Sequence, residues 1–333
     1  MKKIIFLLFI FTYSCEDAVN DNDNSNLIFI ASEGSYGDSD GSITVFKNNE
    51  KIQTIDNIGD VVHSILVNEN KLFVIVNNSH LIKRFSITKS GLSLPGIDID
   101  TDNSSPREMV IVGDKLYFTN WNSKDIKVLN LNTFSIQISI PVEGIPEDIV
   151  SDGDFLYVSI PNLELYDTNN GSSVIKIDIN SQNIVESYEV GFGPEQMILQ
   201  NNNLWISRTY YDSNWSAYYG SSTINLETNE ILTNNYGVGM VCGGNILELN
   251  NQIYRTVDGG IAPLDTELEL NVASKIGSYS NLYSAYSDNQ RIYLGMSDYT
   301  APDTVFVHNE IGDLISTLSV GKLPGDYAIW EKN

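Results

Sequence analysis

The chain has 333 residues, of which 19 are Lys or Arg and 43 are Asp or Glu, so its formal net charge is −24. This charge argues against a nucleic-acid partner, which needs a basic footprint, and against direct binding to anionic lipid headgroups. The length alone would allow two domains, so the number of domains has to come from the pattern along the chain.

The N-terminus has the features of a secretory signal. Two lysines form a positive n-region, residues 4–11 are apolar, and Cys15 follows a small residue. So short an apolar run cannot cross a bilayer. Its end resembles a bacterial lipobox, although Thr12 stands where that pattern usually has Leu. We therefore predict that residues 1–14 are a lipoprotein signal peptide and that Cys15 is lipidated, with ordinary cleavage to a soluble secreted protein as the alternative.

Residues 15–25 have the composition of a tether. They are rich in Asp and Asn and carry too little apolar surface to order themselves. The Gly and the terminal Glu of an EF-hand loop are missing, which favours a plain linker over a calcium site. Acidic residues directly after a lipidated Cys resemble the surface-export signal of Bacteroidota lipoproteins. With lipid on Cys15, Cys242 would have no disulfide partner.

From residue 26 onward one sequence motif recurs, an aliphatic residue followed by an aromatic one within a short predicted strand. The pairs are Ile28-Phe29, Leu72-Phe73, Leu116-Tyr117, Leu156-Tyr157, Leu204-Trp205, Ile253-Tyr254 and Ile292-Tyr293. Each of the last six follows a second apolar strand and a tight polar turn. A period of about 40–50 residues with several short strands per unit is the signature of a β-propeller.

The repeat that begins at Pro106 shows the predicted order of strands. Residues 107–112 form an inner strand, Gly113-Asp114 suits a two-residue hairpin turn, and strands at 116–120, 126–131 and 135–142 follow. An equivalent start lies eleven residues before the aromatic in each of the other complete units. These starts are Val62, Pro146, Pro194, Gly243 and Leu282.

The two ends of the chain supply the parts of one further unit. Residues 324–330 resemble an inner strand with nothing after it, whereas strands at 27–31, 43–46 and 51–55 have no inner strand before them. Joining them closes the ring and removes exposed sheet edges. We therefore predict an all-β, seven-bladed β-propeller over residues 26–333, closed by the C-terminal strand in the N-terminal blade.

Short motifs support this fold. Gly144-Ile145-Pro146 and Gly193-Pro194 precede inner strands, and Leu156-Tyr157-Val158 lies in a second strand. These motifs resemble the YVTN-type propeller repeats. The resemblance implies the fold and no particular activity, because propellers host many functions.

One face of the predicted ring carries the longer loops, at 161–172, 209–221 and 297–303. Long loops on a rigid scaffold are where function tends to lie. Their large amphipathic aromatic side chains suit stacking on sugars, flat macrocycles or a protein partner, with packing of the blade ends as the alternative. The ligand-binding candidates among them are Trp121, Tyr166, Tyr210, Tyr211, Trp215, Tyr218 and Tyr219, and Tyr36 and Tyr299 occupy comparable loops.

A second set of candidates comes from aligning the repeats with one another. The second residue after each blade start is polar in all seven units: Ser64, Glu108, Asp148, Gln196, Asn245, Ser284 and Asp326. We expect these residues, the polar ring, to line the mouth of the channel on the face with the long loops. We assign Glu108, Asp148, Gln196, Asn245 and Asp326 to ligand binding, with ordinary solvated lining as the alternative.

The architecture, the anchor and the repeat type together resemble the propeller surface lipoproteins of Bacteroidota that hand vitamin B12 to a TonB-dependent transporter. The resemblance implies a monomeric capture protein at the outer membrane, facing the cell exterior, whose ligand is cobalamin or another small-molecule nutrient. Membrane contact would be through the lipid alone. No motif in the sequence specifies a corrinoid, and no cofactor is expected.

Two other classes of function stay open at this stage. One is an extracellular scaffold that binds a protein through the aromatic face. The other is a metal-dependent lactonase or lyase, with His63, His80 and Glu108 as the metal-site hypothesis. We assign no catalytic residue, because no nucleophile-elbow motif supports Ser-His-Asp catalysis, and no haem, because no attachment motif is present. We assign no metal ligand either, because the sequence does not show that the three residues converge.

Overall fold

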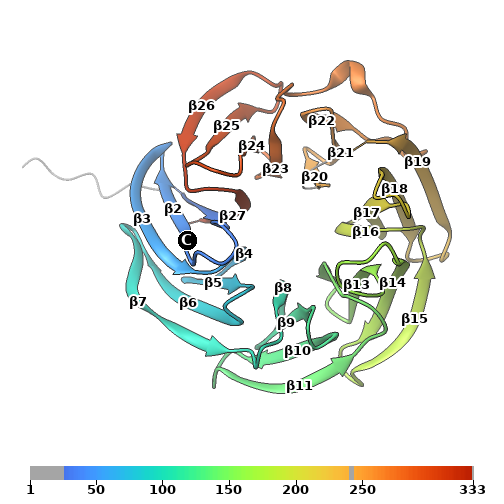
Figure 1. Ribbon diagram of the computed structural model, residues 1–333, viewed down its shortest axis with the longest axis horizontal. Helices are drawn as coiled ribbons and strands as arrows, with labels where there is room; N and C mark the ends of the chain where they lie inside the picture. The colour runs from blue at the N-terminus through green and yellow to red at the C-terminus, as the bar shows by residue number, and fades with distance from the viewer. Residues whose placement is uncertain (1–25, 240–243, 332–333) are drawn as a thin grey trace, which may run out of the picture.

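The computed structural model describes residues 26–239 and 244–331. Within these ranges the chain forms seven antiparallel sheets arranged in a ring (Figure 1). Six of these sheets have four strands and one has three. The fold is therefore the all-β, seven-bladed propeller that the repeat predicts. The predicted signal peptide, Cys15 and the tether lie outside the described residues, and so does Cys242.

The blades follow one another along the chain, each built from the inner strand outward. The blade at the N-terminus has β27 (Pro324–Trp330), β1 (Leu27–Ser32), β2 (Gly41–Lys47) and β3 (Glu50–Gly59). The next has β4 (Val62–Asn68), β5 (Lys71–Val76), β6 (Leu81–Thr88) and β7 (Gly91–Asp100). The third has β8 (Pro106–Val112), β9 (Lys115–Asn120), β10 (Asp125–Asn130) and β11 (Ser135–Pro141).

The remaining four blades complete the ring. The fourth has β12 (Ile149–Ser151), β13 (Phe155–Asn162), β14 (Asn170–Asp178) and β15 (Asn183–Glu189). The fifth has β16 (Pro194–Gln200), β17 (Asn203–Tyr211), β18 (Ala217–Asn225) and β19 (Ile231–Val238). The sixth has β20 (Ile246–Leu249), β21 (Gln252–Val257) and β22 (Gly260–Pro263). The seventh has β23 (Leu282–Ser287), β24 (Arg291–Met296), β25 (Thr304–Asn309) and β26 (Leu314–Ser319).

The ring closes where the two ends of the chain meet. Strand β27 pairs antiparallel with β1, in a register that runs from Leu27↔Trp330 to Ser32↔Pro324. In Figure 1 the red β27 lies inside the blue strands of the N-terminal blade. The prediction that the C-terminal strand completes this blade is confirmed, and β1 is left without a free inner edge.

The sixth blade departs from the four-strand pattern. The segment after β22 contains a short 3-10 helix, η1 (Val272–Ser274), rather than a regular strand. Ile276 forms an isolated bridge to Ile261 of β22, so this irregular segment takes the outer position of the blade.

The side chains of the repeated aliphatic-aromatic motif form the core between blades. Six of its seven aromatic residues are at most 7% exposed, and only Tyr254 is partly exposed. Successive side chains of a strand point to opposite faces. Leu72 therefore packs with the N-terminal blade, whereas its neighbour Phe73 packs with Leu116 and Phe118 of the third blade.

The structure corrects two of the predicted loops. Strand β17 continues through Tyr211 and β18 begins at Ala217, so most of the predicted loop at 209–221 is a β-hairpin. Tyr210 and Tyr218 are cross-strand partners whose rings stack with centroids 5.5 Å apart. Aromatic pairs of this kind favour strand pairing. Strands β13 and β14 likewise extend into the predicted loop at 161–172.

The described part of the chain has no helix long and apolar enough to span a bilayer.

Candidate functional site

The first residues of the inner strands converge on the axis of the ring and surround a cavity of about 310 Å³, the central cavity. It lies on the face that carries the second-to-third strand turns, because Glu33 after β1 and Tyr211 at the end of β17 also line it. All five ligand-binding candidates of the polar ring line this cavity: Glu108, Asp148, Gln196, Asn245 and Asp326.

Several members of the polar ring hold neighbouring blades together. Asp148 accepts hydrogen bonds from the N–H groups of Ile149, at 2.7 Å, and of Met197 in the next blade, at 2.6 Å. Asn245 accepts one in the same way from Ala285, and Asp326 from Ile65. These side chains satisfy backbone donors at the channel wall. Their oxygen atoms are consequently only partly available to a ligand.

The residue just before a polar-ring position carries a functional side chain in five of the seven blades, and of these five only His63 was named from the sequence. These residues are His63, Arg107, Glu147, Glu195 and Tyr283, the mouth residues. For the other four the only sequence signal was their fixed position in the repeat. Glu33, which follows β1 rather than starting an inner strand, carried no such signal.

A repeated hydroxyl contact fixes the backbone of two mouth residues. Thr119 accepts a hydrogen bond from the Glu108 N–H and donates one to the Glu147 carbonyl. Ser159 makes the same two contacts with the Asp148 N–H and the Glu195 carbonyl. Each hydroxyl sits on the second strand of its blade and bridges to the inner strand of the next blade. The carboxylates of Glu147 and Glu195 are thereby carried on a rigid wall.

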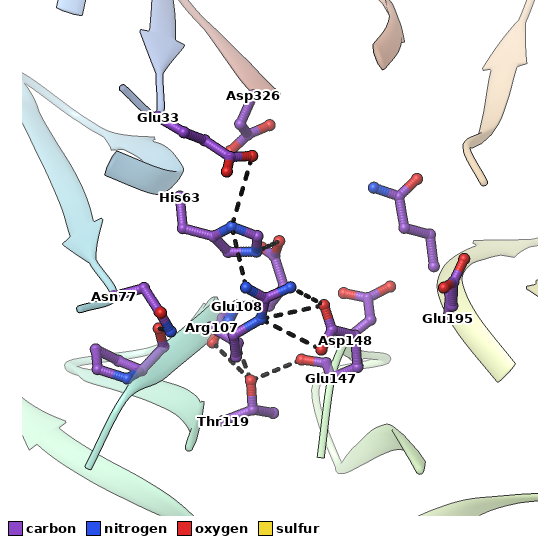
Figure 2. A network of polar contacts seen from close by, with 12 residues as sticks. Glu33, His63, Asn77, Arg107, Glu108, Thr119, Glu147, Asp148, Glu195 and Asp326 are labelled. Atoms are coloured by element: carbon purple, nitrogen blue, oxygen red, sulfur yellow. Dashed lines mark hydrogen bonds and ion pairs between the residues drawn. The ribbon is translucent and has the colours of Figure 1, made fainter. Parts of the chain in front are cut away.

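Arg107 is held by the Glu147 carboxylate (Figure 2) and by the Trp121 ring. Its Nη2 donates to Glu147 Oε1 at 2.6 Å, and its Nε contacts both oxygens of the same carboxylate at 3.2 and 3.3 Å. The guanidinium stacks on the Trp121 ring, 4.0 Å from its centroid. Trp121 Nε1 in turn donates to Glu147 Oε2 at 2.8 Å. Burial alone would lower the pKa of Arg107, but the Glu147 carboxylate raises it, so the group is permanently charged.

His63 lies between the guanidinium and two carboxylates. Its Nδ1 is 3.4 Å from Arg107 Nη1 and 4.0 Å from Glu33 Oε1, and its Nε2 is 3.5 Å from Glu108 Oε1. Burial and the charge of Arg107 hold the pKa of His63 well below its usual range. The imidazole is therefore neutral at pH 7, with Nδ1 placed to accept from Arg107 and Nε2 placed to donate to Glu108.

Six carboxyl side chains and one guanidinium, that of Arg107, are among the described residues that line the central cavity. Its lining carboxylates are Glu33, Glu108, Glu147, Asp148, Glu195 and Asp326. Only Glu147 is paired with Arg107, and the structure shows no ion pair to Glu195 among the described residues. Figure 2 draws Glu195 apart from the network around Arg107.

The carboxyl groups respond to this crowding with raised pKa values. Burial, helped by the charge of Glu147, raises the pKa of Glu195 to about 7. Burial also raises the pKa of Glu108 well above its usual range, with Asp326 and Asp148 adding to the effect. The pKa of Glu33 is raised by burial too, although the Tyr283 hydroxyl donates to its Oε1 at 2.7 Å. A bound cation would relieve this repulsion.

The metal-site hypothesis for His63, His80 and Glu108 is only partly matched by geometry. His63 and Glu108 are neighbours, but His80 lies in the β5–β6 turn, where its Nδ1 accepts from the Ser105 N–H. Among the described residues no group of three or more His, Cys, Asp and Glu side chains is arranged to hold a metal ion.

The aromatic candidates are spread over three environments. Tyr211 lines the central cavity, whereas Trp121 and Tyr166 line a second cavity beside it. Tyr219 packs on Tyr236, and Tyr210 and Tyr218 pack on each other. Trp215 is 58% exposed, with its ring against Tyr211. Neither cavity is lined by Tyr210, Trp215, Tyr218 or Tyr219.

Comparison by sequence finds no relative. No protein-family model matches the chain, and no curated protein matches it either.

Comparison by structure finds many solved chains that superimpose on this one, and those named here have low sequence identity. A functionally unknown protein from Desulfotomaculum acetoxidans superimposes with a TM-score of 0.68, at 10% identity over 93% of this chain and 100% of that one. A Bacteroides fragilis protein provisionally named a 6-phosphogluconolactonase has a TM-score of 0.62, at 15% identity over 93% and 99%. AztD from Citrobacter koseri has a TM-score of 0.57, at 10% identity over 92% and 98%. Likeness at these identities shows the fold alone.

Proposed function

We propose that this protein is a capture protein whose central cavity binds a small organic cation through its ammonium group. The observation that carries the proposal is the lining of the cavity, where six carboxyl groups accompany one guanidinium that is already paired with Glu147. Binding a cation replaces the repulsion among these groups with attraction, so both electrostatics and the raised carboxyl pKa values support it.

An organic cation fits the cavity better than a bare metal ion. Calcium needs six to eight oxygen atoms converging at about 2.3–2.6 Å, whereas here Asp148 and Asp326 already accept backbone hydrogen bonds. An ammonium group needs only a few acceptors and is also attracted to aromatic faces. Tyr211 and Tyr283 line the cavity beside the carboxylates. The cavity volume of about 310 Å³ lies at the small end of the range for ligand pockets.

The biological setting of the proposal comes from the sequence. A lipid on Cys15 would hold a monomeric propeller at the outer membrane, and the captured nutrient would pass to a TonB-dependent transporter. Cobalamin is the narrower candidate that the sequence resemblance implies. A corrinoid is much larger than the central cavity, so it would have to rest across the exposed aromatic loops instead of entering. A protein partner on those loops is the scaffold alternative.

The test is calorimetric titration of the purified protein at about pH 8 with putrescine and, as a neutral control of the same length, 1,4-butanediol. We expect putrescine to bind and to raise the melting temperature, and we expect 1,4-butanediol to do neither. Glu195→Gln should weaken binding by about tenfold, equivalent to about 1.4 kcal/mol. Glu69→Gln, the same charge change in the exposed β4–β5 turn, should not weaken it. Equal responses to the diamine and the diol would overturn the proposal.

The same panel should include cobalamin. A rise in melting temperature with cobalamin but not with putrescine would replace the cation proposal with corrinoid capture. Absence of any response, together with recovery of a specific protein on the immobilised propeller, would favour the scaffold function.

Lactone hydrolysis is a second candidate, favoured by one observation. A carboxyl group in a cavity with a pKa of about 7, as in Glu195, suits a general base that activates water at neutral pH. The carboxylate-rich wall would repel a phosphorylated lactone, so the substrate would be uncharged. Hydrolysis of glucono-δ-lactone above the buffer rate, abolished by Glu195→Gln and retained in Glu69→Gln, would support this activity. A rate equal to buffer would exclude it for that substrate.

A further inference from the structure

A second cavity of about 230 Å³, the side cavity, adjoins the central cavity and shares Glu33 and Arg107 with it as walls. Its lining combines three aromatic residues, Tyr36, Trp121 and Tyr166, with three amide side chains, Asn77, Asn78 and Asn122. This composition differs from that of the central cavity, where carboxylates dominate.

The amide groups of the side cavity are oriented by the protein. Asn77 Nδ2 donates to the Pro106 carbonyl at 2.8 Å, Asn122 Nδ2 donates to the Asn103 carbonyl at 3.1 Å, and Asn78 Nδ2 donates to Asp60. Across the described residues, no hydrogen bond reaches the Oδ1 atom of these three side chains. Each therefore presents a fixed carbonyl acceptor, the kind of group that accepts from a ligand hydroxyl.

Two of the three aromatic rings around the side cavity are exposed, whereas the Trp121 ring stacks on Arg107. Tyr36 is 74% exposed and Tyr166 is 83% exposed, and neither ring contacts another in the described structure. Tyr166 also has a φ of 57°, in the left-handed region where a bulky residue is an outlier and where Gly would be unstrained. The exposed rings of Tyr36 and Tyr166 are therefore available to stack on a ligand beside the cavity.

We propose that the side cavity is a saccharide subsite, and that the ligand is an amino sugar whose ammonium group enters the central cavity. Aromatic faces stack on the apolar face of a pyranose ring, while oriented amide carbonyls accept its hydroxyl protons. Glu33 and Arg107 line both cavities, so a ligand that lies across these two side chains would contact both. The side cavity is of the size of a single ring system. The assignment of the ammonium group rests on the proposed function, whereas the saccharide subsite stands on its own residues.

The experiment compares three probes on the full-length purified protein at about pH 7. The β-1,4-linked glucosamine disaccharide has two amino groups and two sugar rings. Putrescine has two amino groups and no ring, and the N,N′-diacetyl form of the disaccharide has rings and no charge. We expect the glucosamine disaccharide to bind at least about tenfold more tightly than putrescine, because only the disaccharide fills both cavities.

The variant pair Tyr166→Gly and Tyr166→Phe tests the subsite directly. Gly removes the ring and relieves the left-handed φ, so the protein should be at least as stable as the wild type while it loses the advantage of the disaccharide over putrescine. Phe keeps the ring and should keep the advantage. Putrescine binding should be the same in all three proteins.

The possible outcomes separate the two proposals. Equal binding of glucosamine disaccharide and putrescine by the wild type, or equal weakening of both by Tyr166→Gly, would overturn the saccharide subsite and leave cation capture intact. Binding of the diacetyl disaccharide with no binding of putrescine would overturn cation capture and support the subsite. Binding of none of the probes would overturn both.

Discussion

The carboxylate of Asp148 accepts a hydrogen bond of 2.6 Å from the backbone N–H of Met197, which belongs to the next blade. Asn245 makes the equivalent contact with Ala285, and Asp326 with Ile65. A side chain that lines the central cavity is therefore also a structural link between blades. The effect of changing such a residue has to be separated into its charge and its hydrogen bond.

Two substitutions at Asp148 make that separation. Asp148→Ala leaves the N–H groups of Ile149 and Met197 without their acceptor, and we expect it to lower the free energy of unfolding by about 1–3 kcal/mol. Asp148→Asn keeps a side-chain oxygen and removes a carboxyl group whose pKa burial raises to about 7, so it should cost much less. Urea unfolding at about pH 7 measures both. Equal destabilisation by the two variants would show that the charge, and not the hydrogen bond, matters at this position.

Stability should fall as pH rises from about 5 to 8. The pKa of Glu195 is raised from 4.5 to about 7 in the folded protein, and those of Asp148 and Asp326 are raised to about 7 and about 6. Between the unfolded and folded pKa values the native state binds more protons than the unfolded chain. The stability that this provides is fully present below the unfolded pKa values, 3.8 for Asp and 4.5 for Glu, and is lost as pH rises through the folded values of about 6 to 7.

Thermal unfolding at intervals across this range measures the effect. Glu195→Gln should flatten the decline, because it removes one titrating group, whereas Glu69→Gln should leave the slope unchanged. Putrescine should stabilise the protein more at pH 8 than at pH 5, since a cation competes with the bound protons. A melting temperature that increases steadily from pH 5 to 8 would contradict the raised carboxyl pKa values.

Arg107 is expected to oppose cation binding while it supports the fold. Arg107→Met removes the guanidinium that contacts Glu147 and stacks on Trp121. Leaving Glu147 without its partner should lower the free energy of unfolding by about 3 kcal/mol. The same change leaves the cavity more negative, so putrescine should bind more tightly at low ionic strength. Urea unfolding of the variant checks the expected loss of stability, and calorimetric titration of the same preparation checks the expected gain in putrescine affinity. Weaker putrescine binding would show that Arg107 holds Glu147 in the geometry that the cation needs.

The sequence was sufficient for the fold because the information is periodic. The pair Leu72-Phe73 recurs with its turn and its preceding strand, and the alternation of side chains places one member against each neighbouring blade. The unpaired strands at the two ends left one way to close the ring. The sixth blade was not predicted in detail, since the segment around Ile276 replaces a strand with irregular backbone and has no repeat to compare with.

The site was only partly predictable, for a related reason. The polar ring was visible because all its members are polar, and the five candidates named from it line the central cavity. Arg107 and Glu195 share a repeat position with Tyr283 and His63, so residue type gives no common signal there. The link from Asp148 to Met197 joins residues far apart in the chain, and only the folded ring shows that a lining carboxylate is occupied by a backbone N–H. The prediction that Tyr210 and Tyr218 lie in a loop was wrong, because the two residues are cross-strand partners in a β-hairpin.

The last prediction concerns β27, the strand that closes the ring. This strand pairs with β1, which lies at the other end of the chain. Trp330 of β27 is 8% exposed, packs in the core of the N-terminal blade, and donates from Nε1 to Asn70 Oδ1 at 3.0 Å. Trp330→Ala should lower the free energy of unfolding by about 3–5 kcal/mol, which is typical for loss of a buried Trp. Asn70→Ala removes only the hydrogen bond, at a cost of about 1 kcal/mol.

Urea unfolding compares the two variants, and size-exclusion chromatography reports whether the weakened closure exposes the edge of β1 to association. If Trp330→Ala unfolds at the same urea concentration as Asn70→Ala, packing of the closing strand contributes little. In that case the register of β27 against β1, from Leu27 to Ser32, holds the ring by its backbone hydrogen bonds.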